Sequence, residues 1–565
     1  MKILLVGINA KYSHQNLALE YIKRYNENPN IKTREFNINQ NIESIYSEIL
    51  REKPDVLGFS TYIWNFDFVI RLSSDLKKAM ENLIIIWGGP EVSFDNKELM
   101  EKNESVDIII RDEGEVTSKE LFETLENHGD LSKILGITYR DLHVITENPD
   151  RPLIENLDIL PSPFKDYNAP DGKMVYYEMS RGCPFKCAYC LSSTIKGVRY
   201  FSIERIKSDL LEITNSNATT VKLVDRTFNS NEKFSMEIMN FIIENKRDDL
   251  VFHMELMAHL ISDNFLKFLE KMPKGLFQFE IGIQSSNKKT LREISRVTNL
   301  EKLKNSVKTI KSYGNIHQHV DLIAGLPFED FDSFKNSFNY AYSLEAEKLQ
   351  LGFLKLLRGS DLRKKAEELG IIYSEFPPYE VISTKWMTPE EISKLKIIED
   401  VVEKFSNEDY FKWTLEYLIE ESDPFSFFED LAKFWEENGY HLLSHSRASL
   451  YERFVEFIKD RKDYEGLVEV IRLDYLLNQN SPPKDYLNPQ NLEPSEYHEL
   501  LKDKKIRKDF NLDLSIPTKK LVKEFKFQGF GFGGQRRIFG FNYTPKGTNR
   551  LDITEDYERI INGIY

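Results

Sequence analysis

Short apolar runs alternate with amphipathic stretches over the first 130 residues of the chain. The runs are short, β-branched and uninterrupted, as expected for strands buried on both faces of a parallel sheet. They lie at Ile3–Val6, Val56–Phe59, Leu83–Trp87 and Asp107–Ile110. Helical periodicity fills the intervals at Asn16–Tyr25, Ile42–Arg51, Phe68–Met80 and Thr117–Asn127. This alternation predicts an α/β fold with a doubly wound parallel sheet, whose ligand site lies beyond the carboxyl ends of the strands.

The same alternation resumes between about residues 171 and 370 and predicts a partial (β/α)6 barrel. Six strands are expected, and catalytic groups in such barrels lie at the carboxyl ends of the strands. The expected strands are Val175–Met179, Thr220–Asn229, Val251–Glu255, Phe277–Gln284, His319–Pro327 and Leu349–Leu357.

The remaining third of the chain is predicted to be mainly helical. Helical periodicity runs through Ile392–Phe405, Tyr410–Glu420, Pro424–Asn438 and Arg447–Lys459. Near the end, Lys519–Gly547 alternates aromatic residues with glycine and basic residues. This pattern favours a β-hairpin with Gly533-Gly534 at its turn, and stacking of the aromatic rings on RNA bases is the alternative.

The length and composition of the chain predict several globular domains and no membrane-spanning segment. The 565 residues, 41% hydrophobic and 30% charged, are typical of a globular protein of several domains. We expect a first domain over 1–135, a linker over 136–170, a barrel over 171–370 and a C-terminal domain over 371–565. No apolar run is long enough to span a membrane.

Net charge disfavours nucleic acid as a general partner, although one segment is basic. The chain carries −15, whereas residues 502–550 hold 13 Lys or Arg against 4 Asp or Glu. Nucleic-acid binding is thus possible but unsupported. The cysteine usage, which offers no disulfide framework, predicts a reducing, cytoplasmic location.

All three cysteines of the chain fall within eight residues: Cys183, Cys187 and Cys190. Clustered thiolates are ligands for zinc or for iron–sulfur clusters. A fourth cysteine is absent, so the C-x3-C-x2-C spacing predicts a [4Fe–4S] cluster with one iron open for chemistry. Structural cysteines that happen to lie close together are the alternative.

This motif resembles that of the radical S-adenosylmethionine (SAM) enzymes. The resemblance implies that the open iron binds SAM and that the reduced cluster cleaves SAM to a 5′-deoxyadenosyl radical. Similarity to the anaerobic coproporphyrinogen oxidase branch implies a set of SAM-contacting residues, with the arginine holding the SAM carboxylate. They are Tyr189, Glu255, Gln284, Arg296 and Asp321. Asp225 and Asn229 would line the same pocket or serve only the fold.

The four strand-end loops of the first domain resemble those of the cobalamin-binding domain that precedes many radical SAM barrels. The resemblance implies a corrin site built from loop residues. They are Asn9, Tyr12, Ser60, Tyr62, Trp64, Asn65, Gly88, Gly89, Pro90, Glu91, Glu113, Gly114 and Glu115. His14 lacks the Asp-x-His-x-x-Gly context of an axial ligand, so we expect it to serve packing or hydrogen bonding.

Together these resemblances imply a cobalamin-dependent radical SAM enzyme that methylates an unactivated carbon, supplied with electrons by a flavodoxin- or ferredoxin-like donor. The alternatives are other corrin-assisted radical chemistry (cyclisation, rearrangement or coupling), a radical SAM enzyme without cobalamin, and a corrin-binding sensor or carrier. Because no other cysteine is present, a second cluster held by thiolates is excluded. The substrate and the role of the C-terminal domain are not encoded in any motif that we find.

Overall fold

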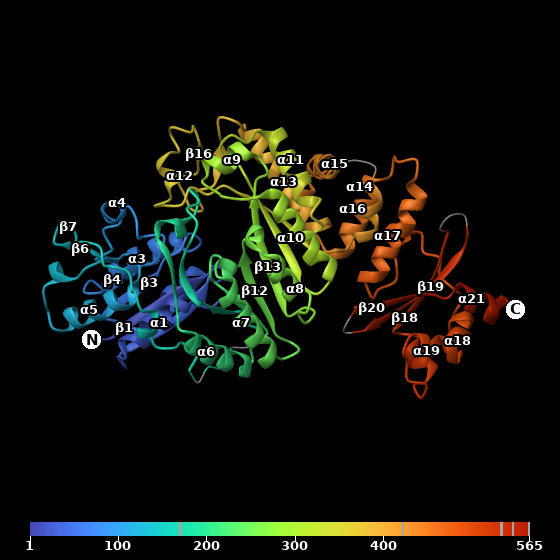
Figure 1. The fold of residues 1–565 in the computed structure, drawn as a ribbon, viewed down its shortest axis with the longest axis horizontal. Helices are drawn as coiled ribbons and strands as arrows, with labels where there is room; N and C mark the ends of the chain where they lie inside the picture. The colour runs from blue at the N-terminus through green and yellow to red at the C-terminus, as the bar shows by residue number, and fades with distance from the viewer. Residues whose placement is uncertain are drawn as a thin grey trace. The chain divides into compact units, whose positions relative to one another are not determined.

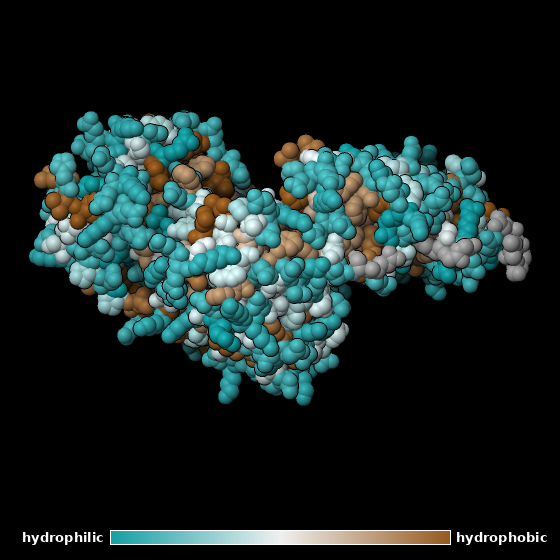
Figure 2. Space-filling view, turned by 90° about the horizontal axis from the view of Figure 1, so that it is seen from above, coloured by the Kyte–Doolittle hydropathy of each residue, from teal (hydrophilic) through white to brown (hydrophobic). Residues whose placement is uncertain are grey.

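The computed structural model describes residues 1–165, 167, 169, 172–420, 423–531, 535–544 and 547–562. The chain divides into two compact units, Met1–Ile392 and Ser393–Tyr565. Within the described residues, no helix has both the length and the apolar character that crossing a bilayer requires. In the space-filling view the surface is mostly hydrophilic, and apolar side chains gather only in small separate groups (Figure 2).

The first unit begins with a seven-stranded sheet in the order β2-β1-β3-β4-β5-β6-β7. Strands β1 to β5 run parallel, and β6 and β7 are antiparallel additions. The elements are β1 (Ile3–Asn9), α1 (Leu17–Asn26), β2 (Ile31–Asn37), α2 (Ile42–Glu52), β3 (Val56–Ser60), α3 (Phe66–Ala79), β4 (Ile84–Gly88), α4 (Asn96–Lys102), β5 (Ile108–Ile110), α5 (Gly114–Glu126), β6 (Ile137–Asp141) and β7 (Val144–Glu147). The order 2-1-3-4-5 has its switch point between β1 and β3, where doubly wound sheets bind ligands.

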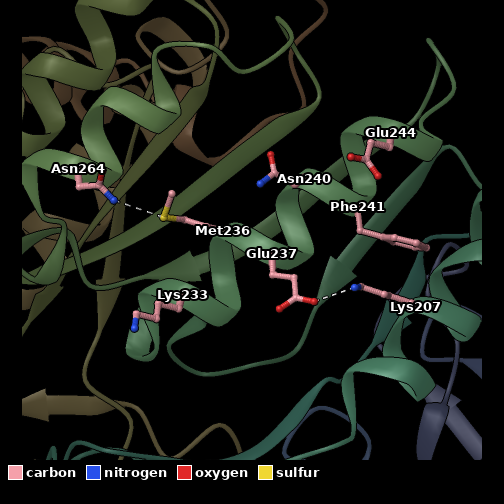
Figure 3. Close-up of a pocket in the computed structure, with 8 residues that line it drawn as sticks. All are labelled: Lys207, Lys233, Met236, Glu237, Asn240, Phe241, Glu244 and Asn264. Carbon is pink, nitrogen blue, oxygen red and sulfur yellow. Dashed lines mark hydrogen bonds and ion pairs between the residues drawn. The ribbon is translucent and has the colours of Figure 1, made fainter.

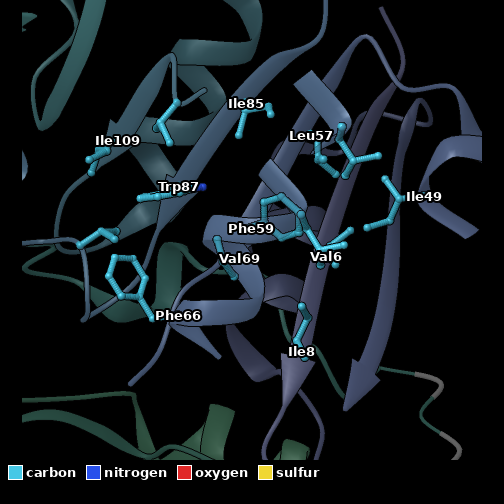
Figure 4. Close-up of a cluster of buried hydrophobic side chains, with 14 of the residues drawn as sticks. Val6, Ile8, Ile49, Leu57, Phe59, Phe66, Val69, Ile85, Trp87 and Ile109 are labelled. Carbon is cyan, nitrogen blue, oxygen red and sulfur yellow. The ribbon is translucent and has the colours of Figure 1, made fainter. Parts of the chain in front are cut away.

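The inner strands β1, β3 and β5 are buried on both faces because consecutive residues enter different cores. Along β1, Leu4, Val6 and Ile8 join the core under α2, α3 and α4, which is shown in Figure 4. Ile3 and Leu5 of the same strand pack with α1 and α5 on the other face. The uninterrupted apolar runs of the sequence are explained by these two cores.

The second sheet is a six-stranded parallel barrel segment in the order β15-β14-β13-β12-β11-β8. Its strands β12 and β13 are labelled in the green part of Figure 1. Its elements are β8 (Val175–Tyr177), α6 (Ile203–Asn215), β11 (Thr220–Leu223), α7 (Glu232–Asn245), β12 (Val251–Leu256), α8 (Asp263–Leu269), β13 (Phe277–Gln284), α9 (Lys288–Glu293), α10 (Leu300–Tyr313), β14 (His317–Ala324), α11 (Phe331–Tyr342) and β15 (Lys348–Phe353). A two-stranded hairpin, β9 (Ser180–Cys183) and β10 (Gly197–Tyr200), follows β8. The partial barrel expected from the sequence is confirmed in its strand number and order.

Two features of the first unit were not predicted. Strand β2 was missed, and the segment expected to be a linker from residue 136 instead begins with β6 and β7, which extend the first sheet. After the barrel come α12 (Asp361–Lys364), the strand pair β16 (Ile372–Tyr373) and β17 (Val381–Ser383), and α13 (Pro389–Phe405), which crosses into the second unit.

The second unit is mainly helical, as predicted, and also contains a three-stranded antiparallel sheet. Its elements are α14 (Lys412–Ile419), α15 (Pro424–Glu437), α16 (Arg447–Phe457), α17 (Tyr464–Asn478), α18 (Pro494–Lys502), α19 (Lys504–Asp509), α20 (Thr518–Leu521), β18 (Phe525–Phe530), β19 (Arg537–Thr544), β20 (Gly547–Asp552) and α21 (Thr554–Tyr557). Strands β18 and β19 form the expected hairpin, whose aromatic residues lie largely in a buried core. The predicted turn at Gly533-Gly534 lies outside the described residues.

Candidate functional site

The hairpin of β9 and β10 carries the three cysteines. Cys183 ends β9 opposite Gly197 of β10, so residues 184–196 form the loop that the hairpin closes. Cys187 is buried, and Cys183 and Cys190 are partly exposed. Gly182 has φ +99°, and a Cβ there would lie 2.1 Å from the carbonyl oxygen of Gly197. Only glycine therefore allows the hairpin to close at this point.

Arg296 lies against the cysteine loop from the segment that follows α9. Its Nη1 donates to the Tyr189 hydroxyl at 3.1 Å and lies 3.7 Å from the Cys187 sulfur. Its Nη2 donates to the carbonyl oxygen of Gly282 and lies 3.3 Å from the Met257 sulfur. The fold thus brings Tyr189 and Arg296 together beside a cysteine of the motif.

The end of β13 is shaped by a register shift between Gly282 and Gln284. Gln284 adopts φ +71°. A Cβ at Gly282 would lie 2.1 Å from Nε2 of Gln284 and 3.1 Å from Nη2 of Arg296. Glycine at 282 thus makes room for both side chains, and the Oε1 of Gln284 is buried without a hydrogen-bond partner.

Glu255 and Asp321 face the interior of the barrel. Burial, reinforced by the negative charges of Glu280 and Glu255, raises the pKa of Asp321 to about 8, and its Oδ1 has no hydrogen-bond partner. Burial also raises the pKa of Glu255, against the opposing charge of Arg226. Unpartnered buried acceptors of this kind are costly unless a ligand satisfies them. The orphaned oxygens of Gln284 and Asp321 fit the ammonium and hydroxyl donors that SAM would bring.

The donor set of the cysteine loop fits a cluster. Among the described residues, no group of three or more His, Cys, Asp or Glu side chains is arranged to hold one metal ion. That finding concerns a single ion only, since each thiolate of an iron–sulfur cubane binds a different iron. Cys183 at the end of β9, with Cys187 and Cys190 in the loop that follows, supplies three thiolates, and the guanidinium of Arg296 beside them supplies the positive charge that such a cluster needs.

One layer further into the barrel, four interior side chains form a polar group. Glu280 accepts from Lys222 Nζ at 3.1 Å and contacts His253 Nε2 at 2.8 Å. The His253 bond, with the Lys222 charge, lowers the pKa of Glu280 to about 2. Burial next to other cationic groups lowers the pKa of His319 to about 4, so this ring is neutral at pH 7. Lys222 and Glu280 retain about a quarter of their side-chain exposure, so the concave face of the sheet is open to water.

The first domain encloses an apolar cavity of about 100 Å³ near the switch point of its sheet. It is lined from α1, α5, Leu5 in the middle of β1 and the ends of β3, β4 and β5, and its wall includes Ser60, Tyr62, Gly88, Gly89 and Gly114. A Cβ at Gly88 or Gly114 would approach no other atom closer than 3.8 or 3.4 Å. The packing of the protein itself does not require glycine at these two positions. A side chain at either position would occupy space in the cavity. This glycine-lined apolar slot fits part of a bulky ligand.

The other polar residues predicted for the corrin site brace its loops. Asn9 donates to the Glu35 carboxylate at 2.6 Å, and Asn65 donates to the carbonyl oxygens of Ile8 and Ser60, both at 2.9 Å. Tyr62 and Trp64 stack with ring centroids 4.3 Å apart.

Three further loop residues lie at the surface of the domain or against the barrel. Tyr12 is exposed beneath the Lys173 ammonium, and Pro90 is exposed. His14 packs edge-on against Tyr176 of β8 at 5.5 Å, and burial lowers its pKa. The packing role expected for His14 therefore has a partner.

Three glutamates predicted for the corrin bind side chains that follow the first domain in the chain. Glu91 accepts from the Tyr379 hydroxyl and from Arg358 Nε at 3.2 Å. Glu113 and Glu115 accept from Arg181 Nη1 and Nη2 at 3.0 and 2.6 Å. These arginines were not singled out from the sequence, although Arg181 stands two residues before Cys183.

Asp225 and Asn229 serve the backbone around the site. Asp225 accepts from the Met179 amide at 3.1 Å and from the Ser180 hydroxyl, and burial raises its pKa to about 7. Asn229 exchanges two hydrogen bonds with the backbone of Met257, at 2.9 and 3.0 Å. Both residues therefore hold strand-end segments next to the cysteine loop.

A separate hollow of about 530 Å³ lies over α6, α7 and α8 (Figure 3). Its wall includes the ion pair of Lys207 with Glu237 and the contact of Asn264 with the Met236 sulfur. None of its lining residues belongs to the strand-end loops, so this hollow is not part of the site.

The fold and the cysteine loop define a class of protein in which a Rossmann-like domain precedes a partial (β/α)6 barrel that carries three clustered cysteines. Three family models match: the B12 binding domain over residues 3–122, the radical SAM superfamily over 177–341, and a protein of unknown function, DUF4080, over 367–536. The chain therefore contains, in this order, a B12-binding domain, a radical SAM domain and a DUF4080 region.

Similar proteins agree with this assignment. The chain is 28% identical over 363 residues to the uncharacterized methyltransferase PH0819 of Pyrococcus horikoshii, covering 60% of this chain and 77% of that protein. It is 26% identical to the cobalamin-dependent radical SAM methyltransferase TokK of Streptomyces tokunonensis, covering 56% of this chain and half of TokK. The solved structure of OxsB, a cobalamin-dependent SAM radical enzyme with aqua-cobalamin and SAM bound, has the same fold, with a TM-score of 0.58 at 15% identity. The match covers 83% of this chain and 78% of OxsB.

Proposed function

We propose that this protein is a cobalamin-dependent radical SAM methyltransferase acting on an unactivated carbon. The observation that carries the proposal is the presence, in one compact unit, of the three-cysteine loop, unpartnered acceptors beside it and a glycine-lined apolar cavity. Two relatives named as methyltransferases, PH0819 and TokK, support methyl transfer as the outcome.

In this proposal Cys183, Cys187 and Cys190 hold a [4Fe–4S] cluster, and the first domain holds cobalamin. When bound, these groups would supply the electron that cleaves SAM and the methyl group that is transferred. The protein would contribute the orientation of these groups relative to one another and to the substrate.

The SAM contacts follow from the geometry around the cysteine loop. Arg296 is held by Tyr189 and Gly282, so its guanidinium is oriented before a carboxylate arrives. The unpartnered oxygens of Gln284 and Asp321 would accept hydrogen bonds from SAM, and Glu255 would contribute negative charge. A bound ammonium group would lower the pKa of Asp321 from about 8 and favour its ionised form.

The corrin contacts are proposed for the residues that line the cavity or stand beside it. Ser60, Tyr62, Gly88, Gly89 and Gly114 form part of its wall. The stacked rings of Tyr62 and Trp64 provide a flat apolar surface at the same loop.

A flavodoxin- or ferredoxin-like protein is proposed as the electron donor, and the three free cysteines favour a reducing, cytoplasmic compartment. A second candidate is radical chemistry other than methylation. It is favoured by a 25% identity over 266 residues to the anaerobic magnesium-protoporphyrin IX monomethyl ester cyclase of Synechocystis, which covers 46% of this chain and 53% of that protein.

The test uses the full chain, reconstituted anaerobically with iron, sulfide and cobalamin, and given a reductant and SAM carrying a deuterated methyl group. Formation of 5′-deoxyadenosine that is lost in Cys190→Ser is expected. With metabolite extract added, we expect S-adenosylhomocysteine and a methylated product that carries three deuterium atoms, compared with the same product made from unlabelled SAM. Formation of 5′-deoxyadenosine with no labelled product from any extract would favour the second candidate.

A further inference from the structure

Two arginines face each other across the hairpin that closes the cysteine loop. Arg181 of β9 is the register partner of Arg199 of β10. Like charges placed directly opposite each other on neighbouring strands destabilise the pair. This hairpin is therefore stable only if carboxylates lie between or beside the two guanidiniums.

One carboxylate of the B12-binding domain binds both arginines. Arg199 donates to Glu113 from Nη1 and Nη2, each at 3.0 Å and each to a different oxygen, and Arg181 donates from Nη1 at 3.0 Å. Glu113 is the residue before α5, in the loop after β5. Its side chain is 12% exposed, so water screens these ion pairs little.

Two further carboxylates complete the charge balance around Arg181. Glu115 of α5 accepts from Nη2 at 2.6 Å, and Glu178 of the barrel accepts from the same nitrogen at 2.8 Å. Five charged side chains thus join the first turn of α5 to the base of the cysteine loop. Glu113 also accepts from the Ile154 amide at 2.7 Å, which ties the segment after β7 to the same point.

The same loop forms part of the wall of the apolar cavity, through Asp112 and Gly114 on either side of Glu113. Glu113 therefore lies between the two candidate cofactor sites. Its backbone neighbours line the apolar cavity, and its carboxylate binds the hairpin that carries the cysteines.

We propose that Glu113 is a positioning residue, which fixes the cysteine hairpin against the B12-binding domain through Arg181 and Arg199 and so sets the cluster relative to the corrin. The inference deepens the proposed function and rests on it for the identity of the two cofactors. It differs from the sequence-based expectation, in which the Glu113 side chain contacts cobalamin.

The test compares Glu113→Gln with a matched control, Glu120→Gln, in the full chain. Glu120 lies on α5, binds Arg151 rather than an arginine of the hairpin, and has a side chain that is about half exposed. Glutamine keeps the shape and removes the charge that both arginines share. Hydrogen exchange of peptides covering residues 184–196 is measured in the chain without cofactors. In the reconstituted chain, the iron and cobalt contents are then measured, together with the EPR spectrum of the reduced cluster with SAM.

Positioning predicts at least about tenfold faster exchange of the loop in Glu113→Gln, with cobalt content unchanged and an altered EPR spectrum, and none of these changes in Glu120→Gln. Unchanged exchange together with loss of cobalt in Glu113→Gln would overturn the inference and return Glu113 to the corrin site. Unchanged exchange with unchanged spectra would overturn it as well.

Arg199→Lys provides the second variant if Glu113→Gln fails to fold. Lysine keeps the charge but cannot bind both Glu113 oxygens through a planar fork, so a smaller increase in loop exchange is expected. No increase would contradict the inference. If the wild-type chain takes up no iron, the proposed function fails, whereas the exchange experiment still decides whether Glu113 holds the hairpin.

Discussion

Replacing Asp321 by Asn is expected to stabilise the protein without cofactors at alkaline pH and to abolish its binding of SAM. Burial of the carboxyl group in the barrel, reinforced by the nearby charges of Glu280 and Glu255, raises its pKa to about 8 in the folded chain. In the unfolded chain the ordinary value is about 4. The folded state thus holds the Asp321 proton more tightly than the unfolded state does.

The sign of the effect follows from this difference. The stabilisation from the bound proton is complete below about pH 4 and is lost as the pH rises through about 8. Each pH unit in this window lowers the free energy of unfolding of the wild type by at most about 1.4 kcal/mol through this group, whereas asparagine does not titrate and contributes no such change. Between pH 6 and pH 8 the free energy of unfolding of Asp321→Asn should therefore rise by about 2 kcal/mol relative to that of the wild type. Water in the open barrel would screen the carboxyl group and reduce this change to about half.

The assay is thermal unfolding of both proteins without cofactors at pH 6, 7 and 8. Because the wild type and the variant share every other titrating group, such as His319, only the difference between their midpoints is compared. The difference should increase by a few degrees over this range. SAM should raise the midpoint of the reconstituted wild type and leave that of the reconstituted variant unchanged. A difference that is independent of pH, or a variant that still binds SAM, would refute the reasoning.

Three further predictions follow from individual sites. Gly88→Val should place a side chain in the apolar cavity and lower the cobalt content at least tenfold while iron is retained; loss of both metals would indicate misfolding instead. Arg296→Lys should weaken SAM binding by about 10- to 100-fold, measured by isothermal titration, because lysine cannot contact Tyr189 and Gly282 together; unchanged affinity would remove Arg296 from the site. Cys187→Ser should reduce iron to a small fraction of the wild-type content while cobalt is retained, and four irons in this variant would contradict the assignment.

The fold was predictable where burial on both faces leaves a strong pattern. Strands such as β1 and β13 were placed closely because their residues are apolar throughout or alternate strictly. Strand β2 was missed because it lies at the edge of the sheet, and of its seven residues only Ile31 and Asn37 are buried. Strand β7 forms the opposite edge, where Val144 is largely exposed, and β6 contributes only three buried residues, so this segment resembled a linker.

The site was predictable for residues that belong to local motifs. The cysteines and Tyr189 are neighbours in the chain, and the structure brings Arg296 to them from more than 100 residues away. The role of the glutamates was harder to predict, because Glu113 and Arg199 are 86 residues apart and lie in different domains. Pairing across a domain interface leaves no periodic pattern in one sequence.

The central claim is that one chain holds both an iron–sulfur cluster and cobalamin. The most direct test is to purify the full chain anaerobically with iron, sulfide and cobalamin supplied, and to measure iron and cobalt per chain. The account predicts about four irons, held by three cysteines, and one cobalt. Four irons without cobalt would contradict the corrin site and leave a radical SAM enzyme whose first domain has another role.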